Sequence, residues 1–191
     1  MPAYIPAMNR FVLAALFLAA ACAPPPQPQP AAQTARPAAN TADVEFMTGM
    51  IHHHAQAILI SKWAPSHNAS ESLQRLAERI AVAQRDEINL MTAWLRDRGL
   101  EPHEHEMMMP GMLTREQLDA LDRARGKDFD RLFLKSMIQH HQGAITMVEK
   151  LHGSYGAAQD ETVFRFSSDV VADQTTEIDR MEKMLTALET Q

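Results

Sequence analysis

The sequence predicts an all-α protein, a four-helix bundle built from two repeated helical hairpins. A motif that begins Met-Ile and contains His-His occurs twice without a gap, at residues 50–58 and 137–145. The segments after each copy also match one another, and no segment alternates apolar and polar residues as a strand does. One hairpin is too small to bury its own apolar stripe, so we expect the two to pack together.

The first hairpin is expected between residues 41 and 98. Its first helix should cover about 43–63, with Thr41 or Asp43 as the N-cap and an Ala-Pro pair at the end. A candidate capping box begins at Asn68 and opens a second helix, which ends before Gly99.

The second hairpin should follow a short extra helix. A capping box from Thr114 to Gln117 starts this short helix, which should end near Gly126. Long helices are then expected at about 127–152 and 160–189. The second helices of the two hairpins align at a spacing of 90 residues rather than 87, so the turns inside the hairpins differ in length.

The N-terminus predicts export. Residues 1–22 are expected to form a signal peptide, because Arg10 precedes an apolar run that is shorter than the roughly 20 residues a membrane-spanning helix needs. Cys22, the only cysteine, follows Leu-Ala-Ala-Ala, which resembles a bacterial lipobox. We expect Cys22 to be lipidated in the periplasm or cell envelope; the alternative is cleavage near Ala21, which leaves a free thiol.

Residues 23–40 are rich in Pro, Ala and Gln and predict an extended linker, which leaves residues 41–191 as one bundle domain. The formal net charge is −6, and no basic patch with interleaved aromatic residues occurs, so nucleic acid is not an expected partner. The sequence also lacks a phosphate-binding loop and a Ser-His-Asp order, so we do not expect an enzyme of those classes.

The repeated His pairs are the first candidate metal ligands. At about 100° per residue, a Met and the two His that follow it at i+3 and i+4 share one helical face. These residues are Met50, His53 and His54 in the first copy and Met137, His140 and His141 in the second. Met47 lies one turn earlier and extends the first set. Imidazoles bind copper, zinc, iron and nickel; the alternative is a set of core histidines with satisfied hydrogen bonds.

The second candidate is an unusual Met/His loop at residues 101–113. Soft thioethers favour Cu(I), and imidazole tolerates both copper states. Its candidate ligands are His103, His105, Met107, Met108, Met109 and Met112. The alternative is a flexible Met-rich segment that covers one end of the bundle.

Polar residues on the second helix of each hairpin are candidate partners of the His ligands, because a ligating imidazole usually donates its other N–H to an oxygen. These residues are Gln84, Glu87, Gln174 and Glu177, which otherwise form the polar edge of the bundle. A carboxylate-bridged di-iron site is not expected, since only one Glu-x-x-His spacing occurs, at Glu149 and His152.

The doubled Met-Ile-x-His-His motif, with the Gln-Glu-Ile-Met pattern from Gln84 to Met91, resembles the domain-of-unknown-function family three hundred and five over about residues 41–188. That resemblance implies a ferritin-like four-helix bundle. It also implies kinship with secreted copper-binding proteins of the CopM type, which are implicated in copper and silver tolerance. By position it implicates the Met and His residues of both motif copies in metal binding.

We therefore predict a periplasmic copper buffer or metallochaperone that binds mainly Cu(I), with Cu(II) or Ag(I) also possible, and that captures and exchanges metal without catalysis. Because imidazoles protonate in acid and thioethers do not, Cu(II) affinity should fall first as the pH falls. The alternatives are an envelope interaction or structural lipoprotein without metal and, more remotely, a metal-dependent redox enzyme.

Overall fold

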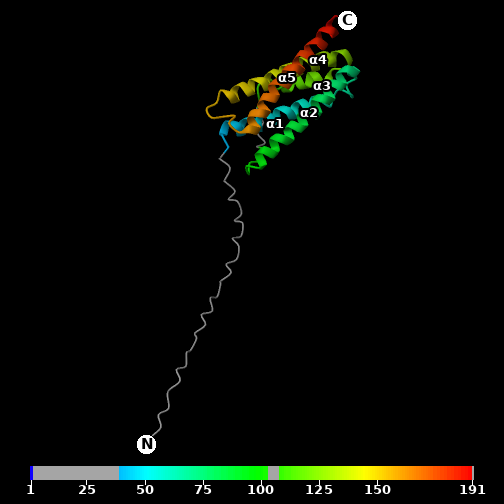
Figure 1. The fold of residues 1–191 in the computed structure, drawn as a ribbon. Coiled ribbons are helices and arrows are strands. Elements are labelled where there is room, and N and C mark those ends of the chain that lie inside the picture. Colours follow the sequence, from blue (N-terminus) through cyan, green and yellow to red (C-terminus); the bar gives the residue numbers. More distant parts are fainter. Residues whose placement is uncertain (2–38, 103–107, 191) are drawn as a thin grey trace. The chain divides into compact units, whose positions relative to one another are not determined.

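The computed structural model describes residues 1, 39–102 and 108–190, and this part of the chain contains five helices and no strand (Figure 1). The first hairpin consists of α1 (Thr41–Ser61) and α2 (Glu71–Arg96), and the second of α4 (Gly126–His152) and α5 (Glu161–Glu189). The short α3 (Arg115–Arg123) packs against α4. The predicted bundle of two hairpins is confirmed.

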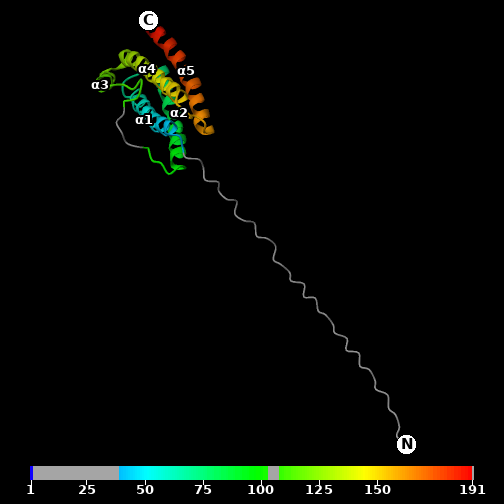
Figure 2. The ribbon, with the colours of Figure 1, turned by 90° about the vertical axis from the view of Figure 1, so that its left-hand side faces the viewer.

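The central contact of the bundle is between α1 and α4, the two helices that carry the repeated His pairs. Each central helix packs along its own hairpin partner, α1 along α2 and α4 along α5. Figure 2 shows this pairing after a 90° turn, with α5 in orange and red beside the yellow-green α4. The His pairs therefore lie inside the bundle rather than at its edge.

The hydrophobic core is divided into two clusters that the repeat relates to one another. The first cluster includes Phe46, Met50, Met91 and Val170, and the second includes their repeat partners Phe133, Met137, Met181 and Ile80. Each cluster draws on both hairpins, which is why neither hairpin could bury its apolar stripe alone. The His pairs fall between the two clusters along α1 and α4.

Two predicted helix starts are wrong by a few residues. Asn40, rather than Thr41 or Asp43, caps α1, because its Oδ1 accepts the Ala42 N–H at 2.8 Å. Ser70 caps α2, and Asn68 instead adopts the left-handed conformation with φ 56° in the preceding turn. The predicted capping box at the start of α3 is present.

The predicted signal peptide, the lipidation site Cys22 and the linker up to residue 38 lie outside the described residues, apart from Met1. Within the described ranges, no helix is both long and apolar enough to cross a bilayer.

A pair of buried aspartates ties each central helix to the turn of the opposite hairpin. Asp43 on α1 accepts the Ala158 N–H at 2.7 Å, in the turn between α4 and α5. Its repeat partner Asp130 on α4 accepts the Ser70 N–H at 3.2 Å, at the start of α2. Because the two bonds run in opposite directions across the bundle, they lock the hairpins to each other.

Replacing Asp43 by Ala should lower the free energy of unfolding by about 2 kcal/mol, because it leaves the buried Ala158 N–H without an acceptor. Urea unfolding monitored by circular dichroism measures this. The exposed Asp179→Ala in α5 is the matched control and should change stability by less than about 0.5 kcal/mol. Equal stability of the Asp43 variant and the wild type would contradict this role.

Candidate metal centre

Four imidazoles meet where α1 crosses α4, and none of them is exposed to solvent. His53 and His140 pack ring against ring, with centroids 3.7 Å apart and planes inclined by 36°. His54 and His141 flank this pair, with ring centroids 6.2 Å from His53 and 6.3 Å from His140 respectively. The helical spacing of the two motifs therefore brings the four predicted His ligands together in one layer.

The Nε2 atoms of the inner pair both face backbone carbonyls. His53 Nε2 lies 3.0 Å from the Pro110 oxygen of the Met/His loop, and His140 Nε2 lies 3.0 Å from the backbone oxygen of His53. A carbonyl oxygen only accepts hydrogen bonds, so the proton of each neutral ring belongs on Nε2.

The outer pair faces carboxylates. His141 Nε2 donates to Glu177 Oε2 at 2.6 Å. His54 Nε2 lies 2.6 Å from Glu87 Oε2, but the two atoms are not aligned for a hydrogen bond. The structure thus brings Glu87 and Glu177 to the His layer, as predicted for residues that orient metal ligands.

The second nitrogen, Nδ1, is buried in all four rings and has no hydrogen-bond partner among the described residues. With the proton held on Nε2 in His53, His140 and His141, the Nδ1 of these rings carries a lone pair that points to no donor. Burying an acceptor without a hydrogen-bond partner costs free energy. A neutral imidazole with a free lone pair is also the form that binds metal. These Nδ1 atoms are therefore available as donors to a metal ion.

Burial keeps the inner rings neutral. It lowers the pKa of His53 from 6.5 to about 3, and the neighbouring His54 adds to the effect. Burial, followed by the proximity of His53, also holds the pKa of His140 well below 6.5. The lone pairs of these rings thus stay available in mild acid.

The other predicted partners, Gln84 and Gln174, are also buried. Neither side-chain atom of Gln84, nor Gln174 Oε1, has a hydrogen-bond partner in the described ranges. Acidic groups gather nearby, since burial and then the charges of Glu87, Asp169 and Glu177 raise the pKa of Asp173. This negative edge beside the two His–Glu contacts attracts cations.

The predicted thioether ligands of the helices lie beside the His layer. Met47, Met50 and Met137 have no exposed surface and belong to the apolar clusters. Met50 and Met137 each lie one helical turn before a His pair, on the same face. In this structure they pack in the core next to the His layer.

The methionines in the described part of the Met/His loop differ in their exposure and contacts. Met108 is 63% exposed, whereas the Met112 sulfur accepts the Met109 N–H at 3.4 Å within the turn. A Cβ at Gly49 would lie 2.9 Å from Met109 Cε and 3.4 Å from Met147 Cε, so both thioethers reach the same point of α1. The predicted ligands His103, His105 and Met107 lie outside the described residues.

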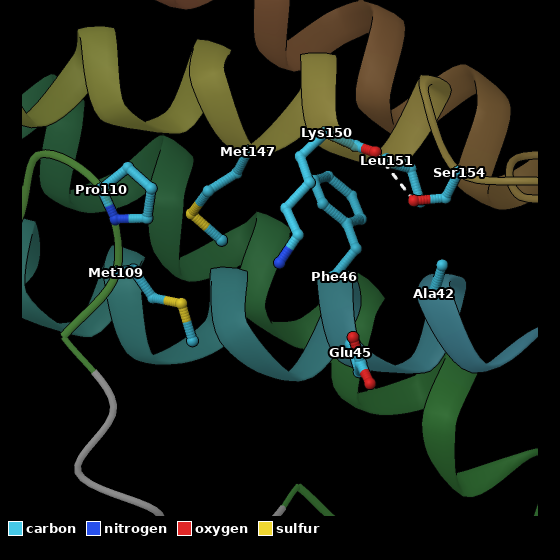
Figure 3. Close-up of a pocket in the computed structure, with 9 residues that line it drawn as sticks. All are labelled: Ala42, Glu45, Phe46, Met109, Pro110, Met147, Lys150, Leu151 and Ser154. Atoms are coloured by element: carbon cyan, nitrogen blue, oxygen red, sulfur yellow. Dashed lines mark hydrogen bonds between the residues drawn. The ribbon is translucent and has the colours of Figure 1, made fainter.

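A cavity of about 150 Å³ opens beside these two thioethers. Figure 3 shows Met109 from the loop and Met147 from α4 at one end, with Phe46 and Leu151 farther along. The wall of the cavity is mainly apolar, and the two thioethers of Met109 and Met147 are part of it.

In the part of the chain that the structure describes, no three or more His, Cys, Asp or Glu side chains lie close enough to hold a metal ion on their own. Ligation that combines one or two Nδ1 atoms with thioethers needs no such group, and it suits a soft ion.

Sequence reasoning missed three residues that hold the loop on the central helices, Gln56, Gln139 and Gly143. They occupy positions where the two motif copies differ, so a search for repeated residues passes over them. It also missed His67, which is buried between Trp63 and Phe129 and contacts the Asp122 oxygen at 2.9 Å, bracing α3.

The sequence family described as "Domain of unknown function (DUF305)" matches residues 43–185. The chain belongs to this family. A curated relative, an uncharacterised protein of Acanthamoeba polyphaga mimivirus, is 37% identical over 59 residues, which are 31% of this chain and 39% of that protein. The match thus spans well under half of that relative.

Solved structures of DUF305 proteins share the fold. A fragment from Deinococcus radiodurans is 30% identical with a TM-score of 0.72, covering 79% of this chain and 99% of that one. A protein from Streptomyces coelicolor is 28% identical with a TM-score of 0.70, covering 78% and 94%. CopM in its Cu(I)-bound form is 29% identical with a TM-score of 0.62, covering 76% and 96%. CopM has also been solved with Cu(II) and with silver.

Stability should fall as the pH drops below about 6.5, because His53 and His140 bind protons in the unfolded chain but not in the fold. Each ring should contribute a slope of about 1.4 kcal/mol per pH unit until its lowered pKa is reached. Urea unfolding of metal-free protein between about pH 7 and pH 5, above most carboxylate titration, measures this. A flat profile over that range would contradict neutral buried rings.

Proposed function

We propose that this domain binds copper, chiefly Cu(I), as a buffer or metallochaperone of the cell envelope. The observation that carries the proposal is the set of four buried Nδ1 atoms, none of which has a hydrogen-bond partner among the described residues. Their Nε2 atoms face oxygens of Pro110, His53, Glu87 and Glu177. Such outer contacts orient imidazoles for metal in proteins generally.

Soft donors next to the imidazoles favour the lower oxidation state. Met50 and Met137 each precede a His pair by one helical turn on the buried face, and Met109 and Met147 both reach Gly49 on α1. Thioethers select Cu(I) over harder ions, and Ag(I) shares that preference. The Cu(I)-bound and silver-bound forms of the similar protein CopM support the same choice.

The mode of action proposed here is capture and exchange of metal without catalysis. A buffer needs ligands that stay competent without a bound proton, and the buried neutral rings supply them. Export through the signal peptide and anchoring through lipidated Cys22 remain part of the proposal. The Streptomyces coelicolor relative is named as a candidate secreted protein, which agrees with export.

A metal-free structural role is the second candidate. The ring contact between His53 and His140, at 3.7 Å, and the lack of a group of three His, Cys, Asp or Glu ligands in the described residues both favour it. In that case the His layer would only fix the register of α1 against α4. The two functions differ in what the His layer contributes when metal is added.

The test is a Cu(I) competition titration of residues 39–191, which keep the Asn40 cap of α1, against a chromogenic chelator under anaerobic, reducing conditions. Wild type should take copper from the chelator, and a variant with all four His of the layer changed to Ala should lose at least about 100-fold in affinity. His152→Ala, at the exposed end of α4, is the control and should bind as wild type does. Circular dichroism verifies that each variant is folded.

The same titration also tests whether the Met/His loop holds the metal. If the four-His variant binds Cu(I) as tightly as wild type, the thioethers and the Met/His loop hold the metal, and the His layer is not the site. A variant with Met108, Met109 and Met112 changed to Leu then separates the loop from the helices. If wild type does not compete for copper at all, the structural role takes precedence.

A further inference from the structure

The segment Met109–Leu113 is fastened to both central helices beside the His layer. On α1, Gln56 holds the backbone of Leu113 at two points: Oε1 accepts its N–H at 2.7 Å, and Nε2 donates to its oxygen at 3.1 Å. On α4, Gln139 Nε2 donates to the Gly111 oxygen at 3.3 Å. Gln117 of α3 donates to Gln139 Oε1 at 3.1 Å and holds that amide in place.

The loop backbone also touches the backbone of α4 directly, at Gly143. A Cβ at Gly143 would lie 2.0 Å from the Pro110 oxygen and 2.5 Å from Gly111 Cα. Gly111 has φ 78°, and its own Cβ would lie 2.5 Å from the Gln139 oxygen. Only glycine permits this approach at either position, so a methyl group at Gly143 must push the loop away.

The same carbonyl that packs on Gly143 accepts the His53 proton. Pro110 oxygen lies 3.0 Å from His53 Nε2. Its neighbours Met109 and Met112 close a tight turn, in which the Met112 N–H donates to the Met109 oxygen at 3.2 Å. The position of this carbonyl thus depends on how the turn is docked onto α1 and α4.

The docking positions are the ones at which the repeat is broken. At the spacing of 87 residues, Gln56 corresponds to Gly143, and His52 corresponds to Gln139. His140, by contrast, bonds through Nε2 to the helix backbone of His53. One imidazole of the inner pair is therefore oriented by a loop, and the other by a helix.

We propose that Gly143 and Gln56 are positioning residues that dock the Met109–Leu113 turn, and that the docked Pro110 carbonyl fixes the tautomer in which His53 presents Nδ1 to the metal. The second half of this inference rests on the proposed copper binding. The first half concerns the metal-free protein and stands apart from it. An outer contact of this kind is worth about 10- to 100-fold in metal affinity.

The test uses ¹⁵N NMR of the His rings in the metal-free domain, followed by the Cu(I) competition titration. In wild type, His53 and His140 should both show the proton on Nε2. In Gly143→Ala, which displaces the turn, and in Gln56→Ala, which releases it, the two His53 nitrogen resonances should move toward each other. His140 should not change in either variant and serves as an internal control.

Cu(I) affinity should fall by about 10-fold or more in both variants. Gly153→Ala, at the end of α4 with an ordinary φ of −78°, is the matched glycine control and should change neither measurement. Gln56→Ala introduces no clash, so it carries the test if Gly143→Ala does not fold.

The outcomes separate the two ideas. Unchanged His53 resonances in both variants would overturn the positioning role, whatever the copper result. Shifted resonances with unchanged copper affinity would overturn the link to metal. Shifted resonances in a domain whose wild type does not take Cu(I) would leave the positioning role standing and remove the proposed function.

Discussion

Four imidazoles buried at one helix crossing need hydrogen-bond partners, and the rest of the bundle is arranged around that need. Each ring places Nε2 near an oxygen, supplied by the loop, by the α1 backbone or by a glutamate of an outer helix. The apolar clusters on either side of the layer exclude other partners. The four Nδ1 atoms are left without hydrogen-bond partners among the described residues. Burying polar atoms in this state costs free energy.

The internal repeat accounts for the stability of this arrangement, and its exceptions account for its asymmetry. Asp43 and Asp130 exchange hydrogen bonds between hairpins, so the crossing of α1 and α4 is braced from both ends. A strictly symmetric chain would give both inner rings the same partner. Gly143 on α4 stands where α1 has Gln56, and its missing side chain admits the loop, which then orients His53 alone.

Most of the fold could be predicted because its causes are periodic. The His pairs at i+3 and i+4 had to share a face with Met50 and Met137, and the repeat required a second hairpin to cover them. The helix caps were harder to predict from the sequence. Asn40 is extended and caps α1, whereas Asn68 is left-handed and caps no helix, and the residue type alone does not reveal this difference.

The candidate site was predictable where it repeats and hidden where it does not. Glu87 and Glu177 reach the imidazoles, whereas the buried side-chain atoms of Gln84 have no hydrogen-bond partner in the described part of the chain. Gln56 and Gly143 look unremarkable in sequence, because their role depends on a loop that returns from far along the chain. A long-range contact made by a single residue produces no periodic pattern in the sequence.

The most direct test is ¹⁵N NMR of the His side chains during a titration with Ag(I), a diamagnetic stand-in for Cu(I). Silver should shift Nδ1 of His53, His54, His140 and His141 and couple to those nitrogens, while Nε2 keeps its proton in each ring. Coupling to Nε2 instead would contradict the assignment of the two nitrogens. Saturation with silver and no change at any of the four rings would contradict the site itself.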